Sequence, residues 1–220
     1  LLGFTLPDNF RKPYLSLNIT DFWRRWHISL SKLLKDYLYI SLGGNRKGKL
    51  RTYVNLFITM LLGGLWHGAA LKFIIWGGFH GLALAFHKYI SSKFPSLSES
   101  KNIITTFFSW LITFHFVVFC WIFFRASDMI VVKQVLHQIF FDFKANRILE
   151  YVTTPSYAII YSVIIGGYLL DSFPTKVNSR FQELFSNKLW PSFGAFTVIM
   201  VIIIYQFKSA NIQPFIYFQF

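Results

Sequence analysis

The sequence predicts an all-α protein: a polytopic membrane helical bundle with interfacial or re-entrant helices. Of its 220 residues, 54% are hydrophobic and 20% aromatic, while only 14% are charged, far from the composition of an average globular domain. Uncharged stretches of about 20 residues recur along the chain, and roughly 20 helical residues cross a hydrocarbon core. Polar and mostly basic segments separate these stretches, as expected for loops between membrane helices.

Five uncharged runs define the expected membrane helices. They are residues 52–71, 73–87, 102–124, 151–170 and 189–207. Four of them are long enough to span a membrane. The run 73–87 is too short alone, but Lys72 and Lys88 at its ends can extend toward headgroups or a wet cavity. We therefore expect four or five membrane helices.

The residues before the first run are the most polar part of the chain, with ten Lys and Arg against three Asp. The segment 18–21 offers several N-caps, so a helix should begin there. Apolar residues then recur near helical spacing between charged ones, which predicts a helix lying in the membrane interface. These residues are Ile28, Leu30, Leu33, Leu34, Tyr37, Leu38 and Ile40. The glycine-rich basic turn 43–49 follows; it is either a phosphate site without P-loop spacing or a solvated membrane loop.

One histidine, His67, lies among Gly63, Gly64 and Gly68 in the uncharged run 52–71. An ionisable group at membrane depth is a functional-site hypothesis by default. The glycines let helices or a ligand approach closely, so a packed, water-poor pocket is plausible. The alternative is a core histidine with both nitrogens hydrogen-bonded, and spacing alone does not decide between the two.

A second glycine cluster carries His80, and His87 follows seven residues later, roughly on the same helix face. A zinc site would need closer spacing and a further ligand, and no His-Glu-x-x-His pattern is present, so we expect no metal. We expect His80 to support the site or bind the acceptor, and His87 to lie at the membrane interface. His115, inside the run 102–124, fits packing or a hydrogen bond between helices better than chemistry. Cys120 is the only cysteine, which excludes a disulfide within the chain.

The net charge of +13 would suggest nucleic acid in a soluble protein. Here the basic residues lie mostly between apolar runs, so membrane lipids with anionic headgroups are the expected partner, and nucleic acid is not. Beyond the third run, Asp128 can cap a helix that carries Val131, Val135, Ile139 and Phe143. The aromatic, uncharged tail 211–220 is expected at the membrane interface.

Several ordered motifs resemble the membrane-bound O-acyltransferase family, and within it the bacterial alginate O-acetyltransferase branch. They are Asn-Ile-Thr-Asp-Phe-Trp-Arg-Arg-Trp-His-Ile-Ser-Leu-Ser at 18–31, Asp-Tyr-Leu-Tyr-Ile at 36–40 with Leu-Gly-Gly-Asn-Arg at 42–46, Gly-Gly-Leu-Trp-His-Gly-Ala at 63–69, Phe-Phe-Arg-Ala at 123–126 and the tail 211–220. The resemblance covers nearly the whole chain but only the C-terminal half of such a protein. Because the chain also starts without Met or a signal peptide, an N-terminal truncation is expected.

The resemblance implies a single membrane domain, 1–220, and roles for individual residues. Its parts are an interfacial motif region at 1–51, helices carrying the catalytic histidine at 52–90, and further membrane helices with the tail at 102–220. His67 matches the family's catalytic histidine, and His27 matches the second motif position. The neighbouring motif residues are expected to bind substrates: Trp23, Trp26, Asp36, Asn45, Arg46, Trp66 and His80. In such proteins the two motifs line a tunnel between a cytoplasmic donor and an acceptor on the other face of the membrane.

The chemistry of O-acyl transfer asks for little beyond an imidazole. A neutral His67 could take the proton of a sugar hydroxyl as it attacks a thioester, while His27 orients the acceptor or stabilises the carbonyl oxygen. An acyl-histidine intermediate remains open, and no Gly-x-Ser-x-Gly elbow supports a serine-hydrolase mechanism. We expect no bound cofactor, with acetyl-CoA or an acyl-carrier thioester as co-substrate.

The setting implied by the resemblance is a bacterial inner membrane, with a multi-pass enzyme, an exported polysaccharide acceptor such as alginate, and periplasmic or membrane partner proteins. Two alternatives stay open. One is D-alanyl transfer to teichoic acid from a carrier-protein thioester. The other is a non-enzymatic transport subunit, because broken, glycine-interrupted helices at membrane depth also occur in transporters.

Overall fold

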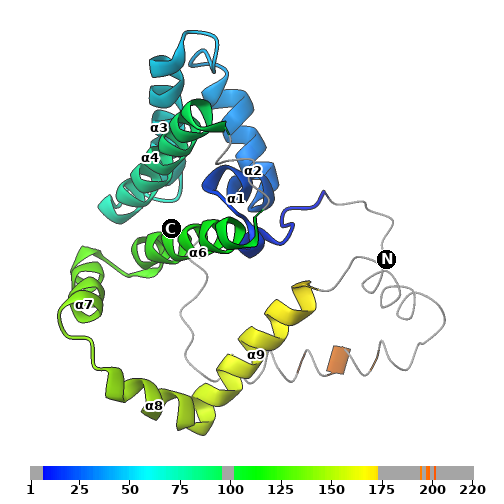
Figure 1. The fold of residues 1–220 in the computed structure, drawn as a ribbon. Coiled ribbons are helices and arrows are strands. Elements are labelled where there is room, and N and C mark those ends of the chain that lie inside the picture. The colour runs from blue at the N-terminus through cyan, green and yellow to red at the C-terminus, as the bar shows by residue number, and fades with distance from the viewer. Residues whose placement is uncertain (1–6, 96–101, 173–193, 195–196, 199–200, 202–220) are drawn as a thin grey trace. The chain divides into compact units, whose positions relative to one another are not determined.

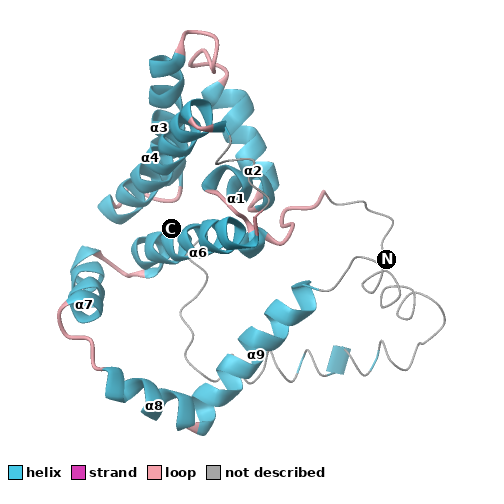
Figure 2. Ribbon diagram, viewed as in Figure 1, coloured by secondary structure: helices cyan, strands magenta, loops and turns pink. Residues whose placement is uncertain are grey.

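The computed structural model describes residues 7–95 and 102–172 and four further positions, 194, 197, 198 and 201. All regular elements in these parts of the chain are helices, which confirms the predicted all-α class (Figures 1 and 2). Contacts divide the chain into two units, Leu1–Thr154 and Pro155–Phe220, and each is described by itself. The expectation of a single domain stays a prediction.

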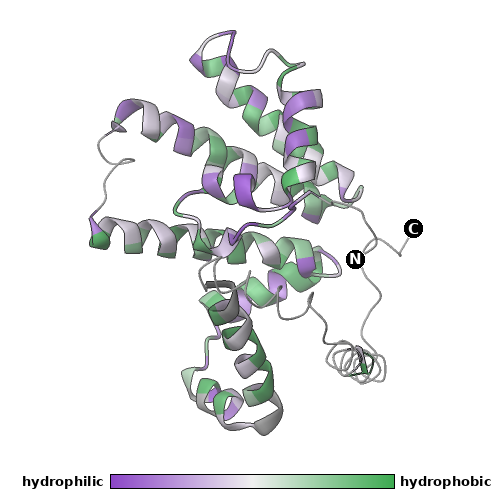
Figure 3. Cartoon of the chain, turned by 90° about the vertical axis from the view of Figure 1, so that its right-hand side faces the viewer, coloured by the Kyte–Doolittle hydropathy of each residue, from purple (hydrophilic) through white to green (hydrophobic). Residues whose placement is uncertain are grey.

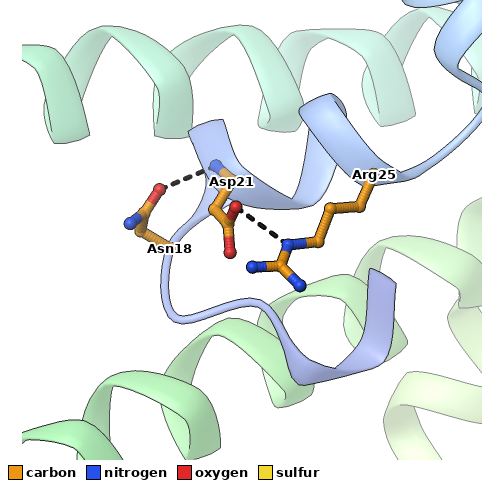
Figure 4. A network of polar contacts seen from close by, with 3 residues as sticks. All are labelled: Asn18, Asp21 and Arg25. Atoms are coloured by element: carbon orange, nitrogen blue, oxygen red, sulfur yellow. Dashed lines mark hydrogen bonds and ion pairs between the residues drawn. The ribbon is translucent and has the colours of Figure 1, made fainter. Parts of the chain in front are cut away.

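The first unit begins with the short 3-10 helix η1 (Pro13–Leu15) and helix α1 (Ile19–Arg25). The predicted start of α1 is confirmed, because Asn18 is its N-cap and its Oδ1 accepts a hydrogen bond from the Asp21 N–H at 2.8 Å (Figure 4). Asp21 in turn pairs with Arg25 one turn later, at 2.9 Å. A cap matters here because a helix of seven residues makes few hydrogen bonds of its own.

The chain breaks its helix at His27 and resumes with α2 (Ile28–Leu33) and the π-helical turn η2 (Leu34–Tyr39). Of the apolar residues predicted to recur near helical spacing, Leu30 and Leu34 are buried, four residues apart. The Ile40 N–H donates to the Lys35 carbonyl, the wider i to i+5 pattern of a π-turn. The predicted amphipathic segment is therefore helical but locally widened.

Helices α3 (Lys49–Trp66) and α4 (Leu71–Lys93) form an antiparallel hairpin (Figure 1). They touch at glycines, as the glycine clusters predict. A Cβ added at Gly64 would lie 2.2 Å from the Phe73 carbonyl oxygen, and one at Gly77 would lie 2.3 Å from that of Met60. Backbone against backbone is the contact that small residues allow between membrane helices.

The glycine-rich turn before α3 is fastened to that helix by one buried amide. Asn55 Nδ2 donates to the Leu42 and Gly44 carbonyls at 3.2 and 2.9 Å. Gly43 and Gly44 both adopt positive φ, 104° and 55°, which glycine tolerates at little cost. These hydrogen bonds hold the turn against α3, and its basic residues Arg46, Lys47 and Lys49 are exposed.

Helix α6 (Ile103–Arg125) packs on α4 and η1 and matches the predicted run 102–124. Within the described residues, it is the one helix whose length and apolarity suffice to cross a membrane. Figure 3 shows hydrophobic residues along the long helices. Ile103 and Ile112 on α6 are 83% and 68% exposed, a wide apolar surface of the kind that faces lipid or a partner helix. The number of spans stays a prediction.

The core of the first unit lies where α1, α3, α4, α6 and α7 meet. Its buried members are Ile19, Phe22, Trp23, Met60, Trp76, Leu84, Val117, Cys120, Phe123, Ala126 and Val132. One polar contact joins α4 to the end of α6, because the Lys72 ammonium donates to the Ala126 carbonyl. A cation at that position also complements the C-terminal end of the helix dipole.

Helices α7 (Met129–Phe140) and α8 (Ala145–Thr153) complete the first unit. Asp128 caps α7 as predicted, accepting from the N–H groups of Ile130 and Val131 at 2.7 and 3.0 Å. These hydrogen bonds lower the pKa of the Asp128 carboxyl. The helix ends before Phe143, which the pattern had included.

The second unit contains α9 (Pro155–Ser172). The uncharged run 151–170 is therefore not one continuous helix, because α8 ends at Thr153 and α9 begins at Pro155. Proline is favoured in the first turn of a helix. Most of the predicted run 189–207 and the whole tail 211–220 lie outside the described residues.

The glycine contact between α3 and α4 can be tested with a matched pair. Gly77→Ala should lower the free energy of unfolding by about 1–3 kcal/mol relative to Gly78→Ala, because its methyl meets the Met60 backbone and overpacks the contact. At Gly78 the nearest atom to an added Cβ is a Leu61 methyl at 3.7 Å, an ordinary contact. Both changes gain the same helix propensity. Thermal unfolding in detergent measures the difference, and equal stability would contradict the close packing.

The cap of α1 gives a second test. Asn18→Ala should cost about 1 kcal/mol of stability, because the Asp21 N–H loses its acceptor, whereas Asn18→Asp keeps an acceptor and should cost much less. The same unfolding measurement applies. A loss of equal size in both variants would show that the cap does not determine the stability of α1.

Candidate active site

His67 lies at the C-terminal end of α3, in the turn that leads into α4. Its backbone N–H donates to the Gly64 carbonyl at 3.0 Å, and Gly68 after it adopts a φ of 151°. A Cβ at Gly68 would also lie 2.8 Å from the Phe73 ring. Only glycine meets both demands, and this explains the Trp-His-Gly order at the site.

Four aromatic rings surround the His67 imidazole, which is 7% exposed. The ring centroids of Trp66, Trp76 and Phe124 lie at 5.0, 5.3 and 5.1 Å, nearly perpendicular to the imidazole, and Phe73 lies at 6.3 Å. These rings come from α3, α4 and α6. They form a water-poor setting around the imidazole, although Trp66 itself is 59% exposed.

His27 has a strained backbone between α1 and α2. Its φ and ψ of 45° and 56° are left-handed, a conformation that costs a non-glycine residue on the order of 1–3 kcal/mol. Asn9 stabilises this turn, because its carbonyl accepts from the Ile28 N–H and its Oδ1 accepts from both the N–H and the hydroxyl of Ser29. Such strain is common at functional sites.

The His27 side chain reaches toward the same region as His67. The two imidazoles are close enough for a charge on His27 to act on His67. The His27 Nδ1 is buried and has no hydrogen-bond partner among the described residues. Burial lowers the pKa of His27 below its ordinary value, so the neutral ring predominates near pH 7.

His80 connects α4 to α1. It is fully buried, and its Nδ1 accepts a hydrogen bond from Trp23 Nε1 at 3.2 Å. Phe22 stacks on its ring at 6.3 Å, and Trp76 lies 4.8 Å away. Trp76 also contacts His67, so an unbroken path of ring contacts leads from α1 to His67.

The other predicted site residues divide into two groups. Trp26 joins the aromatic wall, stacking on Phe22 at 5.7 Å and contacting Trp121 of α6 at 5.5 Å. The second group is exposed, and no described contact brings it to the histidines: Asp36, Asn45 and Arg46. The basic turn meets α3 at Asn55, twelve residues or about 18 Å along the helix from His67. A role in substrate binding for all these residues stays a prediction.

The structure adds residues that sequence reasoning passed over. Trp76 and Phe124 contact His67 directly, and Asn9 stabilises the His27 turn. Trp76 precedes His80 by four residues, a spacing that places both on one face of α4 and could have identified it. His87, by contrast, contacts Thr20 at 2.8 Å, near the start of α1.

No group of three or more His, Cys, Asp or Glu that could hold a metal ion occurs among the described residues. A depression of about 460 Å³ lies along α7 and the turn after it, lined by Lys133, Gln134, His137, Gln138 and Asp142. We do not assign it to the site, because His27, His67 and His80 do not line it and it is widely open. The arrangement around His67 instead suits proton transfer in a dry setting.

The chain belongs to the membrane-bound O-acyltransferase family, MBOAT, whose sequence pattern matches residues 1–124. The probable alginate O-acetylase AlgI of Pseudomonas fluorescens is 35% identical over the whole chain, which covers 52% of that protein. A peptidoglycan O-acetyltransferase of Helicobacter pylori is 50% identical over 60% of the chain, 24% of its own length.

A teichoic acid D-alanyltransferase of Bacillus subtilis is 33% identical over 54% of the chain, 32% of its own length. The chain thus spans about half the length, or less, of the curated relatives it matches. The resemblance inferred from the motifs is confirmed at the level of the family.

The lowered pKa of His27 predicts how stability depends on pH. The folded state holds this ring neutral below the ordinary histidine pKa, so the unfolded state binds more protons and stability falls as pH drops through about 6.5. His27→Asn should reduce this acid-side loss, because asparagine does not titrate, but not abolish it, because His67 and His80 stay buried. Asparagine also tolerates the left-handed backbone. Unfolding temperatures between pH 5 and 8 measure it.

The matched control is His137→Asn, which replaces an exposed histidine of α7. The unfolding temperature of this variant should change with pH as that of wild type does. If His27→Asn also has the slope of wild type, the folded state does not hold His27 neutral.

Proposed function

We propose that this protein is an O-acyltransferase of a bacterial cell membrane that transfers acetyl groups to hydroxyls of an exported polysaccharide such as alginate. The observation that carries the proposal is the enclosure of His67 by four aromatic rings at the Trp-His-Gly motif. Family membership and the O-acetylating relatives support it. His67 is the proposed general base.

In the proposed reaction, His67 takes the proton of a sugar hydroxyl as its oxygen attacks the carbonyl carbon of a thioester. The carbon–sulfur bond then breaks, and the leaving sulfur takes the proton from the imidazolium. Each proton and bond is thereby accounted for, with one ester and one thiol as products. The aromatic enclosure excludes water, which would otherwise hydrolyse the donor.

His27 has the second role in this proposal, orienting the acceptor hydroxyl. Its left-handed backbone, maintained by Asn9, fixes the direction of the imidazole, and its unpartnered, buried Nδ1 is available to a hydroxyl. Trp23 and Trp26 position this segment through their contacts with His80 and Trp121. Preorganised groups of this kind lower a barrier because they need no rearrangement during the reaction.

The proposed setting is a multi-pass protein of the inner membrane. The donor, acetyl-CoA or an acyl-carrier thioester, arrives from the cytoplasm, and the acceptor is reached on the other face. Membrane lipids and periplasmic or membrane acetylation proteins are the proposed partners. The exposed apolar surface of α6 supports contact with lipid.

The second candidate function is D-alanyl transfer to teichoic acid. The Bacillus subtilis relative favours it, but that similarity covers 54% of the chain, against the whole chain for the alginate O-acetylase. The same His67 chemistry would serve, because both reactions transfer an acyl group from a thioester to a hydroxyl. The two are distinguished by the acyl group on the exported polymer.

His67→Ala in the full-length gene should reduce ester-linked acetyl on the exported polysaccharide by about a hundred- to ten-thousandfold, the usual contribution of a general base. The matched control is His115→Ala, an exposed histidine of α6 whose Nδ1 lies against the Leu111 carbonyl. Protein in the membrane and total polymer are measured alongside. Cells with His115→Ala should carry as much ester-linked acetyl on the exported polysaccharide as cells with the wild-type protein.

Three results would change the assignment. Unchanged acetylation in His67→Ala would make His67 a packing residue. Loss of polymer export itself would favour a transport subunit. Loss of ester-linked D-alanine in place of acetyl would favour the teichoic acid reaction.

A further inference from the structure

Two buried N–H groups close to His67 have no hydrogen-bond partner among the described residues. Trp76 is 5% exposed, and its Nε1 is buried without a partner. His80 is fully buried, and its Nε2 is likewise unpartnered. Both residues lie on the same face of α4, four positions apart, with ring centroids separated by 4.8 Å.

The hydrogen bond from Trp23 determines which His80 nitrogen carries the proton. Trp23 Nε1 can only donate, so the His80 Nδ1 that receives it must be unprotonated. The proton of the neutral ring is therefore on Nε2, which makes Nε2 a donor. Trp76 Nε1 is also a donor and cannot accept. The site thus holds two donors that lack an acceptor.

Buried donors without partners are rare in folded proteins, because desolvating an N–H and leaving it unpaired costs free energy. Two in one contacting pair indicate that an acceptor from outside these residues fills the position. The surrounding side chains are aromatic, with Phe22 and Phe116 against His80 and Phe124 against Trp76. A neutral acceptor that gains negative charge only during a reaction suits such a setting.

The position relative to His67 indicates which acceptor this is. The Trp76 ring stands perpendicular to the His67 imidazole at 5.3 Å, so a group bound at Trp76 lies beside the proposed base. In acyl transfer, the atom next to the reacting carbon that gains charge is the carbonyl oxygen. Donors aimed at that oxygen in a dry site typically supply a large share of catalysis.

We propose that Trp76 Nε1–H and His80 Nε2–H bind the carbonyl oxygen of the acyl donor and are catalytic residues of this protein. This proposal rests on the proposed acyl transfer at His67. As the hydroxyl oxygen bonds to the carbonyl carbon and its proton passes to His67, the carbonyl electron pair moves onto the oxygen held by these donors. The pair then returns, the carbon–sulfur bond breaks, and the sulfur takes the proton from His67.

Trp76→Phe tests the first donor, because it keeps a ring and removes the N–H. The measurement is the initial rate at which ester-linked acyl groups, acetyl and D-alanyl, appear on exported polymer in cells making the full-length protein, per unit of protein in the membrane. We expect a tenfold to thousandfold fall, about the effect of losing one such donor. The control is Trp110→Phe on α6, which also keeps a ring and removes an N–H, here the one that donates to the Tyr14 carbonyl, and it should stay within about twofold of wild type.

The role of His80 is tested by two substitutions, His80→Gln and His80→Asn, whose side-chain amides each mimic one of the two ring nitrogens. The amide nitrogen of His80→Gln reaches the place of Nε2 and keeps a donor there, whereas the amide oxygen of His80→Asn reaches the place of Nδ1 and keeps only the acceptor for Trp23. We expect His80→Gln to retain at least tenfold more activity than His80→Asn. If His80→Asn is as active as His80→Gln or more active, His80 serves only to accept the hydrogen bond from Trp23. That result would overturn its proposed catalytic role.

The remaining outcomes separate the two proposals. If His67→Ala abolishes acyl transfer while Trp76→Phe has the wild-type rate, a buried water satisfies the Trp76 donor, and the present proposal alone fails. If acyl transfer persists in His67→Ala, the proposed function at this site fails first. A fall in Trp110→Phe as large as in Trp76→Phe would show a general effect of losing a tryptophan N–H and would also overturn the proposal.

Discussion

The close approach of α3 and α4 is the constraint on which the rest of the structure depends. Because residues 64 and 77 are glycines, the backbone of each helix can occupy the space that a side chain at the glycine of the other helix would fill. Helices in direct contact bring the residues beside those glycines together, Trp76 from α4 and His67 at the end of α3. Such a contact is stabilised by van der Waals packing of complementary surfaces, because apolar side chains gain little free energy when they move from lipid into protein.

Helix α1 is attached to this hairpin through one buried hydrogen bond and a set of ring contacts. The bond from Trp23 to His80 joins the first motif to the second, 57 residues apart in sequence. It brings the strained turn at His27 within electrostatic range of His67. The strain at His27 is balanced locally, because Asn9 accepts three hydrogen bonds from the residues that follow it.

The same features explain why the two site helices are less apolar than α6. Helices α3 and α4 carry buried polar atoms that are hydrogen-bonded within the protein, namely Asn55 Nδ2, Thr59 Oγ1 and His80 Nδ1, and they use glycine where close contact is needed. Helix α6 has no such demand on its outer face and presents isoleucine and phenylalanine there. The two helices of the candidate site thus differ in composition from α6, because they need glycines for close contact and polar groups for internal hydrogen bonds.

The sequence by itself determined the helical class, the helix start within 18–21, the cap at Asp128, the importance of the glycines and the family, because periodicity, capping and motif order depend on residues near one another in the chain. It also indicated His67 and His80. Only the tertiary structure decided that Trp76 and Phe124 enclose His67, that His27 is left-handed, and that Asp36, Asn45 and Arg46 are exposed and, in the described contacts, separate from the histidines. Those features arise from contacts between residues up to 57 positions apart, which no local pattern encodes.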